Sequence, residues 1–169
     1  MKKTLTILIV FFIALTSVQA QNTAKLQSIF IYNFIKLIEW PASANASGTF
    51  DIAVIGNDPI IAELTNLAKA KKAGSLTIKV TKASSASDAG TPHIIYVPKS
   101  QSGQIGNIKA SVGSKPVLII SDTDGGTTKG ADINFVIVDN KPKFEITPAS
   151  AQSKSLKISS NLVNLGISK

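Results

Sequence analysis

Residues 50–59, FDIAVIGNDP, read as a buried strand, a glycine turn and the start of a helix. The β-branched and aromatic run that closes at Ile55 favours a strand, and Gly56 ends it. Asp58 is a capping residue and Pro59 fits the first turn of a helix. A strand that leads directly into a helix is the first half of a βαβ unit, so this stretch predicts an α/β domain.

The same alternation of strand and helix continues on either side of this stretch. Short β-branched runs predict strands over residues 76–80, 93–97 and 116–120, and helical spacing predicts helices over 58–74, 101–110, 149–155 and 160–165. Residues 133–138 and 143–146 predict a β-hairpin, in which Pro142 indicates an edge strand or a loop longer than two residues. Polar residues 84–90 are expected to form a loop. The pattern predicts a single α/β domain, with a mixed, mostly parallel sheet flanked by helices and a C-terminal β-hairpin.

A helix with a broad apolar surface is predicted over residues 24–39, ahead of the first strand. Trp40 and Pro41 end it, because the residue before a proline is disfavoured in helical conformation. Ile31 and Ile35 widen its apolar stripe into an arc. Such a helix is either buried on two sides within the domain or shared with a second copy of the chain. Ile31 and Ile35 are therefore candidate self-association residues of a homodimer.

Residues 1–20 have the pattern of a secretory signal peptide. Lys2 and Lys3 precede an apolar run, and Ala20 marks the expected cleavage point. The apolar run is shorter than the ~20 residues that a membrane-spanning helix needs, which disfavours an anchor. Cleavage leaves residues 21–169 as the mature domain. The sequence suggests a Gram-negative source, so we expect a periplasmic protein, with full secretion as the alternative.

Charge and cysteine content narrow the classes of function. The chain has 18 Lys and Arg against 10 Asp and Glu, and every basic residue is lysine. Nucleic-acid readers rely on arginine for bidentate contacts, so nucleic-acid binding is not expected. Dispersed lysines are typical of a solvated surface, with weak attraction to an anionic membrane face as the alternative. The chain has no cysteine, which removes disulfides, thiol nucleophiles and thiolate metal sites.

The sequence carries no intact catalytic, metal or cofactor motif. His93 is the single histidine, and beside an apolar strand it is expected to be structural. Residues 122–126, DTDGG, resemble a calcium loop, but Ile133 stands where a bidentate Glu is required. Residues 125–130 have phosphate-loop spacing, but Ala131 replaces the essential lysine. No two carboxylates have a defined spacing, so an enzyme of unrecognised type ranks behind a binding function, and no cofactor is expected.

Polar residues after two of the predicted strands are candidate ligand-binding residues. Gly56, Asn57 and Asp58 follow the first strand, and Ser121 and Asp122 follow a later one. Open α/β sheets bind ligands at the carboxyl ends of parallel strands, and a helix N-terminus there favours an anion. Helix capping by Asp58 is the competing role. A periplasmic small-ligand sensor or carrier is therefore the alternative function.

Six blocks of the mature chain share their order with one family of proteins. They are residues 29–41 (IFIYNFIKLIEWP), 52–59 (IAVIGNDP), 93–97 (HIIYV), 116–122 (PVLIISD), 133–136 with 143–146, and 156–162 (LKISSNL). In this order the chain resembles the YfiR/HmsC-like periplasmic proteins over nearly all of its mature length. The ordered set is more specific than any one block.

The resemblance implies a compact α/β domain that regulates signalling in the periplasm, often as a dimer. Family members restrain a membrane-bound diguanylate cyclase or occur with sensor kinases, upstream of cyclic-di-GMP or two-component signalling. No catalytic residues carry over. Some members have a cysteine before the histidine of the central strand; here Thr91 and Pro92 precede His93, which excludes redox control of that type. We expect a non-enzymatic regulatory protein that binds an inner-membrane signalling protein.

Overall fold

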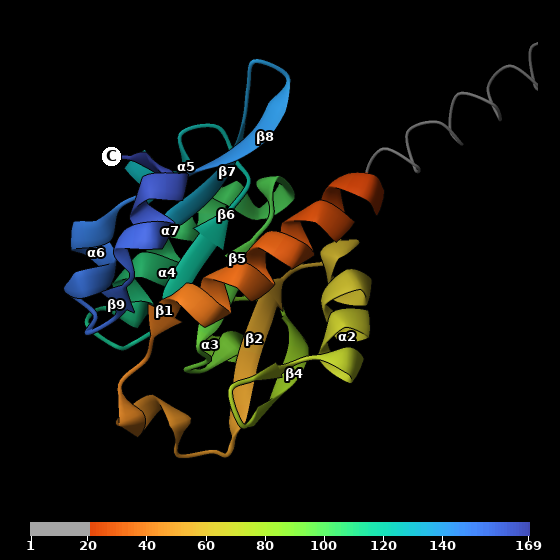
Figure 1. Ribbon diagram of the computed structural model, residues 1–169, viewed down its shortest axis with the longest axis vertical. Helices are drawn as coiled ribbons and strands as arrows, with labels where there is room; N and C mark the ends of the chain where they lie inside the picture. Colours follow the sequence, from red (N-terminus) through yellow and green to blue (C-terminus); the bar gives the residue numbers. More distant parts are fainter. Residues whose placement is uncertain (1–20) are drawn as a thin grey trace, which may run out of the picture.

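Eight strands form one mixed sheet at the centre of the molecule (Figure 1). The computed structural model describes residues 21–169, so the predicted signal peptide over 1–20 lies outside the described part. The strands stand in the order β10-β8-β7-β6-β5-β2-β4-β3. Their bounds are β2 (Thr49–Ile55), β3 (Lys72–Ala73), β4 (Leu76–Ala83), β5 (Ile94–Val97), β6 (Leu118–Ser121), β7 (Ile133–Val138), β8 (Lys141–Ile146) and β10 (Ile167–Ser168). A separate antiparallel pair joins β1 (Ile38–Glu39) to β9 (Lys157–Ile158).

The strand order reverses between β2 and β5. β2 pairs in parallel with both β4 and β5, and β6 and β7 continue the parallel sheet beyond β5. β3 and β8 pair antiparallel with their neighbours, β4 and β7. The prediction of a mixed, mostly parallel sheet with a C-terminal hairpin is confirmed. A crevice at the carboxyl ends of the strands near such a reversal is where open α/β sheets bind ligands.

Helices cover both faces of the sheet and enclose two hydrophobic cores. They are a helix over residues 21–37, α2 (Ile60–Ala70), α3 (Ala86–Ala89), α4 (Ile105–Val112), α5 (Gly126–Lys129), α6 (Pro148–Gln152) and α7 (Ser160–Leu165), with 3-10 turns η1 (Ala42–Asn45) and η2 (Lys99–Gln104). The N-terminal helix, α2, α6 and α7 enclose the larger core, and α4 with α3 encloses the smaller one. No helix among residues 21–169 has the length and apolar character to cross a membrane.

The N-terminal helix lies across one face of the sheet (Figure 1). Ile31 is fully buried and Ile35 is 7% exposed, both within the core of a single chain. Phe34 packs edge-on against Phe144 of β8, with ring centroids 4.9 Å apart. The part of the arc around Ile31 and Ile35 is therefore buried within the domain, as in the intradomain alternative, whereas Leu26 and Ile29 are 37% and 47% exposed. Neither isoleucine is exposed for contact with a second copy of the chain. A homodimer stays a prediction, but one in which Ile31 and Ile35 do not form the contacts.

Several elements differ in detail from the sequence prediction. The first helix ends at residue 37 instead of 39, because Ile38 and Glu39 pair with β9. Residues 84–90 are not a plain loop, since they contain α3, whose first turn is capped by the Ser85 hydroxyl accepting from the Asp88 N–H. β3, β9 and β10 have two residues each, too few to give a periodic pattern.

The β7–β8 hairpin turns through two residues, Asp139 and Asn140. Their φ angles are 52° and 57°, the left-handed pair of a type I′ turn. The loop is therefore no longer than two residues. Of the two explanations for Pro142, a longer loop or an edge strand, the edge strand is the one that the structure shows. Pro142 pairs with Ile137, whereas β10 pairs with β8 only at Glu145 and Ile146. The missing N–H of Pro142 thus lies on the part of β8 that has no outer neighbour.

Replacing Asn140 with glycine is expected to raise the free energy of unfolding by about 0.5–1 kcal/mol, because glycine adopts positive φ without steric cost. The matched control is Asn66→Gly, at an exposed position inside α2. There glycine should lower the free energy of unfolding by a few tenths of a kcal/mol, since it weakens helices. Urea denaturation followed by circular dichroism measures both. The same sign at the two sites would contradict the turn assignment.

Candidate functional site

A groove lies between the first turns of the N-terminal helix and the β7–β8 hairpin. The cavity has a volume of about 680 Å³. Leu26 and Phe30 line it from the helix, and Phe135 and Ile137 line it from β7. Two of these apolar side chains face solvent, because Leu26 is 37% exposed and Ile137 is 68% exposed. Large aliphatic groups at this exposure on both walls form an apolar surface with no covering element among the described residues.

Aromatic rings support the base of the groove. The Phe30 ring lies 6.0 Å from the ring of Phe135 and 6.0 Å from that of Phe144. Behind it, Phe34 stacks on Phe135 at 5.9 Å. Rings at these separations attract one another, so these contacts hold the helix and the hairpin together at the base of the groove.

A polar network closes the end of the groove nearest the carboxyl ends of β5 and β6. The Asp122 carboxylate accepts a hydrogen bond of 2.6 Å from the Lys99 backbone N–H and one of 3.4 Å from Gln27 Nε2. Tyr96 donates from its hydroxyl to Gln27 Oε1 over 3.0 Å. Burial raises the pKa of the Tyr96 hydroxyl well above its ordinary value, and the Asp122 and Asp58 carboxylates raise it further. Tyr96 therefore stays protonated and holds the helix against the sheet.

Of the five predicted ligand-binding residues, Asp122 is the one that lines the groove. Ser121 is fully buried and donates to Asn134 Oδ1 at 2.6 Å, so its hydroxyl serves the fold. Asp58 caps α2, because its Oδ1 accepts from the Ile60 N–H at 2.9 Å. Burial raises the pKa of Asp58, the Ile60 N–H lowers it, and the charge of Asp122 raises it. Helix capping, which was the alternative to ligand binding for Asp58, is therefore present in the structure.

Gly56 and Asn57 lie near the strand reversal but outside the residues that line the groove. A Cβ on Gly56 would lie 3.0 Å from the side chain of Gln101, so η2 packs closely over this turn. The five candidate residues do not converge on one cavity. Their role in binding a ligand stays a prediction, and Asp122 is the member placed to take part.

The sequence did not predict the apolar walls of the groove. Phe135 and Ile137 sit in a strand predicted correctly, but a local pattern does not show which of its faces remains uncovered. One signal was present: five of the six residues of β7, INFVIV, are apolar and occur on both faces of the strand, although the hairpin lies near a sheet edge. A single exposed apolar residue such as Ile137 is common on protein surfaces, and the structure is needed to show that it lies in one groove with Leu26 and Phe30.

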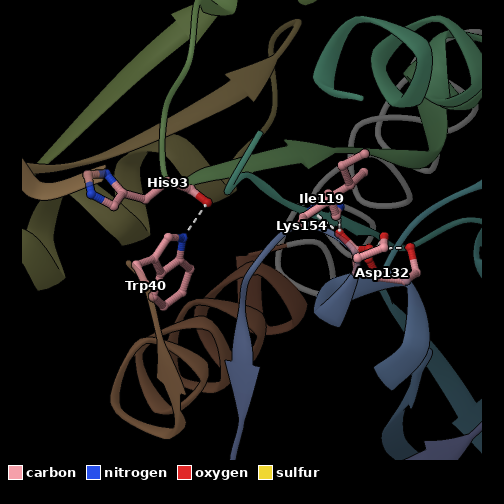
Figure 2. Close-up of polar contacts among 7 residues, drawn as sticks. Trp40, His93, Ile119, Asp132 and Lys154 are labelled. Carbon is pink, nitrogen blue, oxygen red and sulfur yellow. Dashed lines mark hydrogen bonds and ion pairs between the residues drawn. The ribbon is translucent and has the colours of Figure 1, made fainter. Parts of the chain in front are cut away.

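His93 has a structural role. Its ring is 3% exposed and stacks on Phe50 with centroids 4.3 Å apart. Nδ1 accepts from the Asp51 N–H at 3.0 Å, so the ring is neutral there and its Nε2–H donates to Asn45 Oδ1 at 3.2 Å. Burial lowers the pKa of His93, which favours this neutral form. Figure 2 shows Trp40 donating from its indole N–H to the His93 backbone carbonyl at 3.3 Å.

The DTDGG turn after β6 is organised by the protein's own side chains. Asn134 Oδ1 accepts from the Thr123 N–H at 3.2 Å, and the Lys99 ammonium lies 3.1 Å from the Asp124 carboxylate. Within residues 21–169, no three His, Cys, Asp or Glu side chains gather into a set that could hold a metal ion. The turn shapes one end of the groove.

A family model described as YfiR/HmsC-like matches residues 24–167. The chain belongs to this family. YfiR/HmsC-like proteins are periplasmic regulators of signalling, and the resemblance drawn from the ordered sequence blocks is confirmed. No curated protein matches the chain.

A solved structure shares the fold of this YfiR/HmsC-like domain. It is a conserved domain protein from Vibrio cholerae, with a TM-score of 0.56 and 11% sequence identity. The match covers 86% of this chain and 59% of the Vibrio protein, so the chain spans less than two thirds of that neighbour's length. At this identity the likeness concerns the fold alone.

Proposed function

We propose that the mature protein is a non-enzymatic regulatory module of the periplasm, and that its groove binds the exported part of an inner-membrane signalling protein. The partner is of the diguanylate cyclase or sensor kinase type, upstream of cyclic-di-GMP or two-component signalling. Membership of the YfiR/HmsC-like family supports a regulatory role. The observation that carries the proposal is the apolar groove with Ile137 68% exposed on its wall.

The groove has the composition of a protein-binding surface. Its centre is apolar and aromatic, whereas its end carries Lys99, Asp122 and Asp124. Interfaces combine such an apolar centre with a polar rim. The Lys99–Asp124 ion pair is exposed, with side chains 67% and 93% accessible, so it adds little to stability and either partner can pair with an incoming charge.

The test is a pull-down of tagged residues 21–169 from detergent-solubilised membranes of the source cell, read by mass spectrometry. The bait is compared with Ile137→Lys, which places a charge on the groove wall. Recovery of the partner is expected to fall roughly tenfold or more, as for the loss of a central interface residue. The recovered protein should be an inner-membrane cyclase or sensor kinase.

Leu165→Lys is the matched control. Leu165 is 70% exposed on α7 and does not line the groove, so this variant carries the same substitution at the same exposure elsewhere. It should recover the partner as the unchanged protein does. Equal recovery by both variants would remove the groove from the proposal, and no membrane signalling protein in any pull-down would contradict the proposed function.

A small-ligand sensor or carrier is the second candidate, and the size of the groove favours it. Ligand pockets measure roughly 300–1,000 Å³, and this cavity of about 680 Å³ falls inside that range. A metabolite that binds only the folded protein should raise its melting temperature. For a ligand of the groove, that rise should disappear in Ile137→Lys and persist in Leu165→Lys. A screen with no such metabolite would leave the protein-binding function as the sole candidate for the groove.

A further inference from the structure

The β3–β4 edge of the sheet carries a concentration of positive charge. Five exposed lysines lie on the last turn of α2, on the link to β3, on β3 and on β4: Lys69, Lys71, Lys72, Lys79 and Lys82. Residues 64–87 contain no Asp or Glu. The antiparallel pairing of β3 with β4 places Lys72 opposite Thr77. The lysines of α2 and β3 therefore lie beside the strand that carries Lys79 and Lys82. We call this surface the lysine edge.

The lysines of the lysine edge form no ion pairs with carboxylates of residues 21–169. Every ion pair among residues 21–169 involves other lysines: Lys99, Lys154, Lys157 and Lys169. Asp51 of β2 stands beside Lys79 in the parallel register, but no ion pair joins the two side chains. The Asp88 carboxylate accepts from the Ser84 N–H. The five lysines of the lysine edge are thus outside every ion pair of residues 21–169, and the edge has a net positive charge.

We propose that the lysine edge binds the anionic headgroups of a membrane. Lysine is a hydrated point charge on a flexible stem, suited to diffuse attraction more than to a fixed bidentate contact. Lys79 and its neighbour Val80 point to opposite faces of β4, and Lys82 shares the face of Val80, so the charges surround an edge instead of lining a cleft. None of the five lysines lines the groove. Mobile lipid headgroups can gather around such an edge, whereas the fixed carboxylates of a protein would need a matching geometry.

The position of the lysine edge leaves the groove free. β3 and β4 stand at one end of the sheet order, and β7 and β8 stand towards the other. A domain held at a membrane by the lysine edge would therefore still present the groove to a second molecule. This inference does not rest on the proposed function, since a protein with any use of the groove could bind a membrane through its other end.

Vesicle flotation tests the proposal with residues 21–169. The protein is expected to float with vesicles that contain phosphatidylglycerol and to stay behind with pure phosphatidylcholine, and salt should weaken binding because the Debye length falls to about 3 Å at 1 M. The triple variant Lys71→Gln, Lys72→Gln and Lys79→Gln should bind about a hundredfold more weakly. That factor corresponds to about 1 kcal/mol for each lysine near an anionic surface.

The matched control is Lys25→Gln, Lys115→Gln and Lys141→Gln, which removes the same charge from exposed positions elsewhere. Its binding should fall less than about threefold, because these lysines lie outside the lysine edge and distant charges are screened. Thermal denaturation should show both triple variants folded, since all six side chains are exposed. No flotation with phosphatidylglycerol, or equal loss in both variants, would overturn the proposal. Binding to soluble polyglutamate without flotation would assign the edge to an acidic protein and overturn it as well.

Discussion

Replacing Lys154 with alanine is expected to lower the free energy of unfolding by about 3–5 kcal/mol. Lys154 donates to the Asp132 carboxylate, and the two side chains are 5% and 1% exposed. The same carboxylate accepts from the Ile119 N–H at 2.7 Å and from the Ser150 hydroxyl at 2.7 Å. Figure 2 shows Ile119 and Lys154 beside Asp132. Burial lowers the pKa of Lys154, and the charge of Asp132 opposes that change. Removal of the ammonium leaves a buried carboxylate without its counter-charge.

Lys157→Ala is the control for this prediction. Lys157 lies three residues further along the chain and pairs with Glu39 at 3.1 Å, but the two side chains are 77% and 69% exposed. Solvent screens such a pair, so its loss should cost between zero and about 1 kcal/mol of unfolding free energy. Urea denaturation followed by circular dichroism compares both variants with the unchanged protein. A similar small loss for both would show that the Lys154–Asp132 pair does not secure the C-terminal segment.

Gly126→Ala is expected to lower the free energy of unfolding by about 2–4 kcal/mol, through overpacking and lost hydrogen bonds. A Cβ at this position would lie 2.6 Å from Asn134 Cγ and nearer still to Asn134 Oδ1 and Ser121 Oγ. These atoms cannot withdraw without a loss, since Ser121 donates to Asn134 Oδ1 and both residues are fully buried. The backbone of the turn after β6 must therefore shift, and with it the end of the groove.

Gly106→Ala supplies the contrast. Gly106 lies inside α4, and a Cβ there would meet nothing within 4 Å. Alanine favours the helix over glycine, so this variant should be more stable by up to about 1 kcal/mol. Thermal and urea denaturation of the two Gly→Ala variants should thus move in opposite directions. If Gly126→Ala unfolds at the same urea concentration as the unchanged protein, the close packing between Gly126 and Asn134 is not required by the fold.

The sequence by itself determined the elements whose cause is local. The run from Phe50 to Ile55 forms β2, and Asp58 caps α2 as its position before Pro59 predicts. The apolar runs before Pro98 and before Ser121 form β5 and β6, which fixes the parallel centre of the sheet and hence the fold class. These features follow from backbone preferences and side-chain periodicity, which neighbouring residues express without help from the rest of the chain.

The tertiary structure decided which surfaces are covered and which distant groups meet. It buried Ile31 and Ile35 inside the domain, while it left Ile137 exposed in a strand of similar apolar character. It also joined Lys154 to Asp132, 22 residues earlier, in a pair that no spacing predicts. Periodicity marks a side chain as apolar or polar, but its exposure depends on the segment that packs against it. Here the groove exists because the N-terminal helix and the hairpin, which residues 38–132 separate in the sequence, lie side by side with exposed apolar residues on both walls.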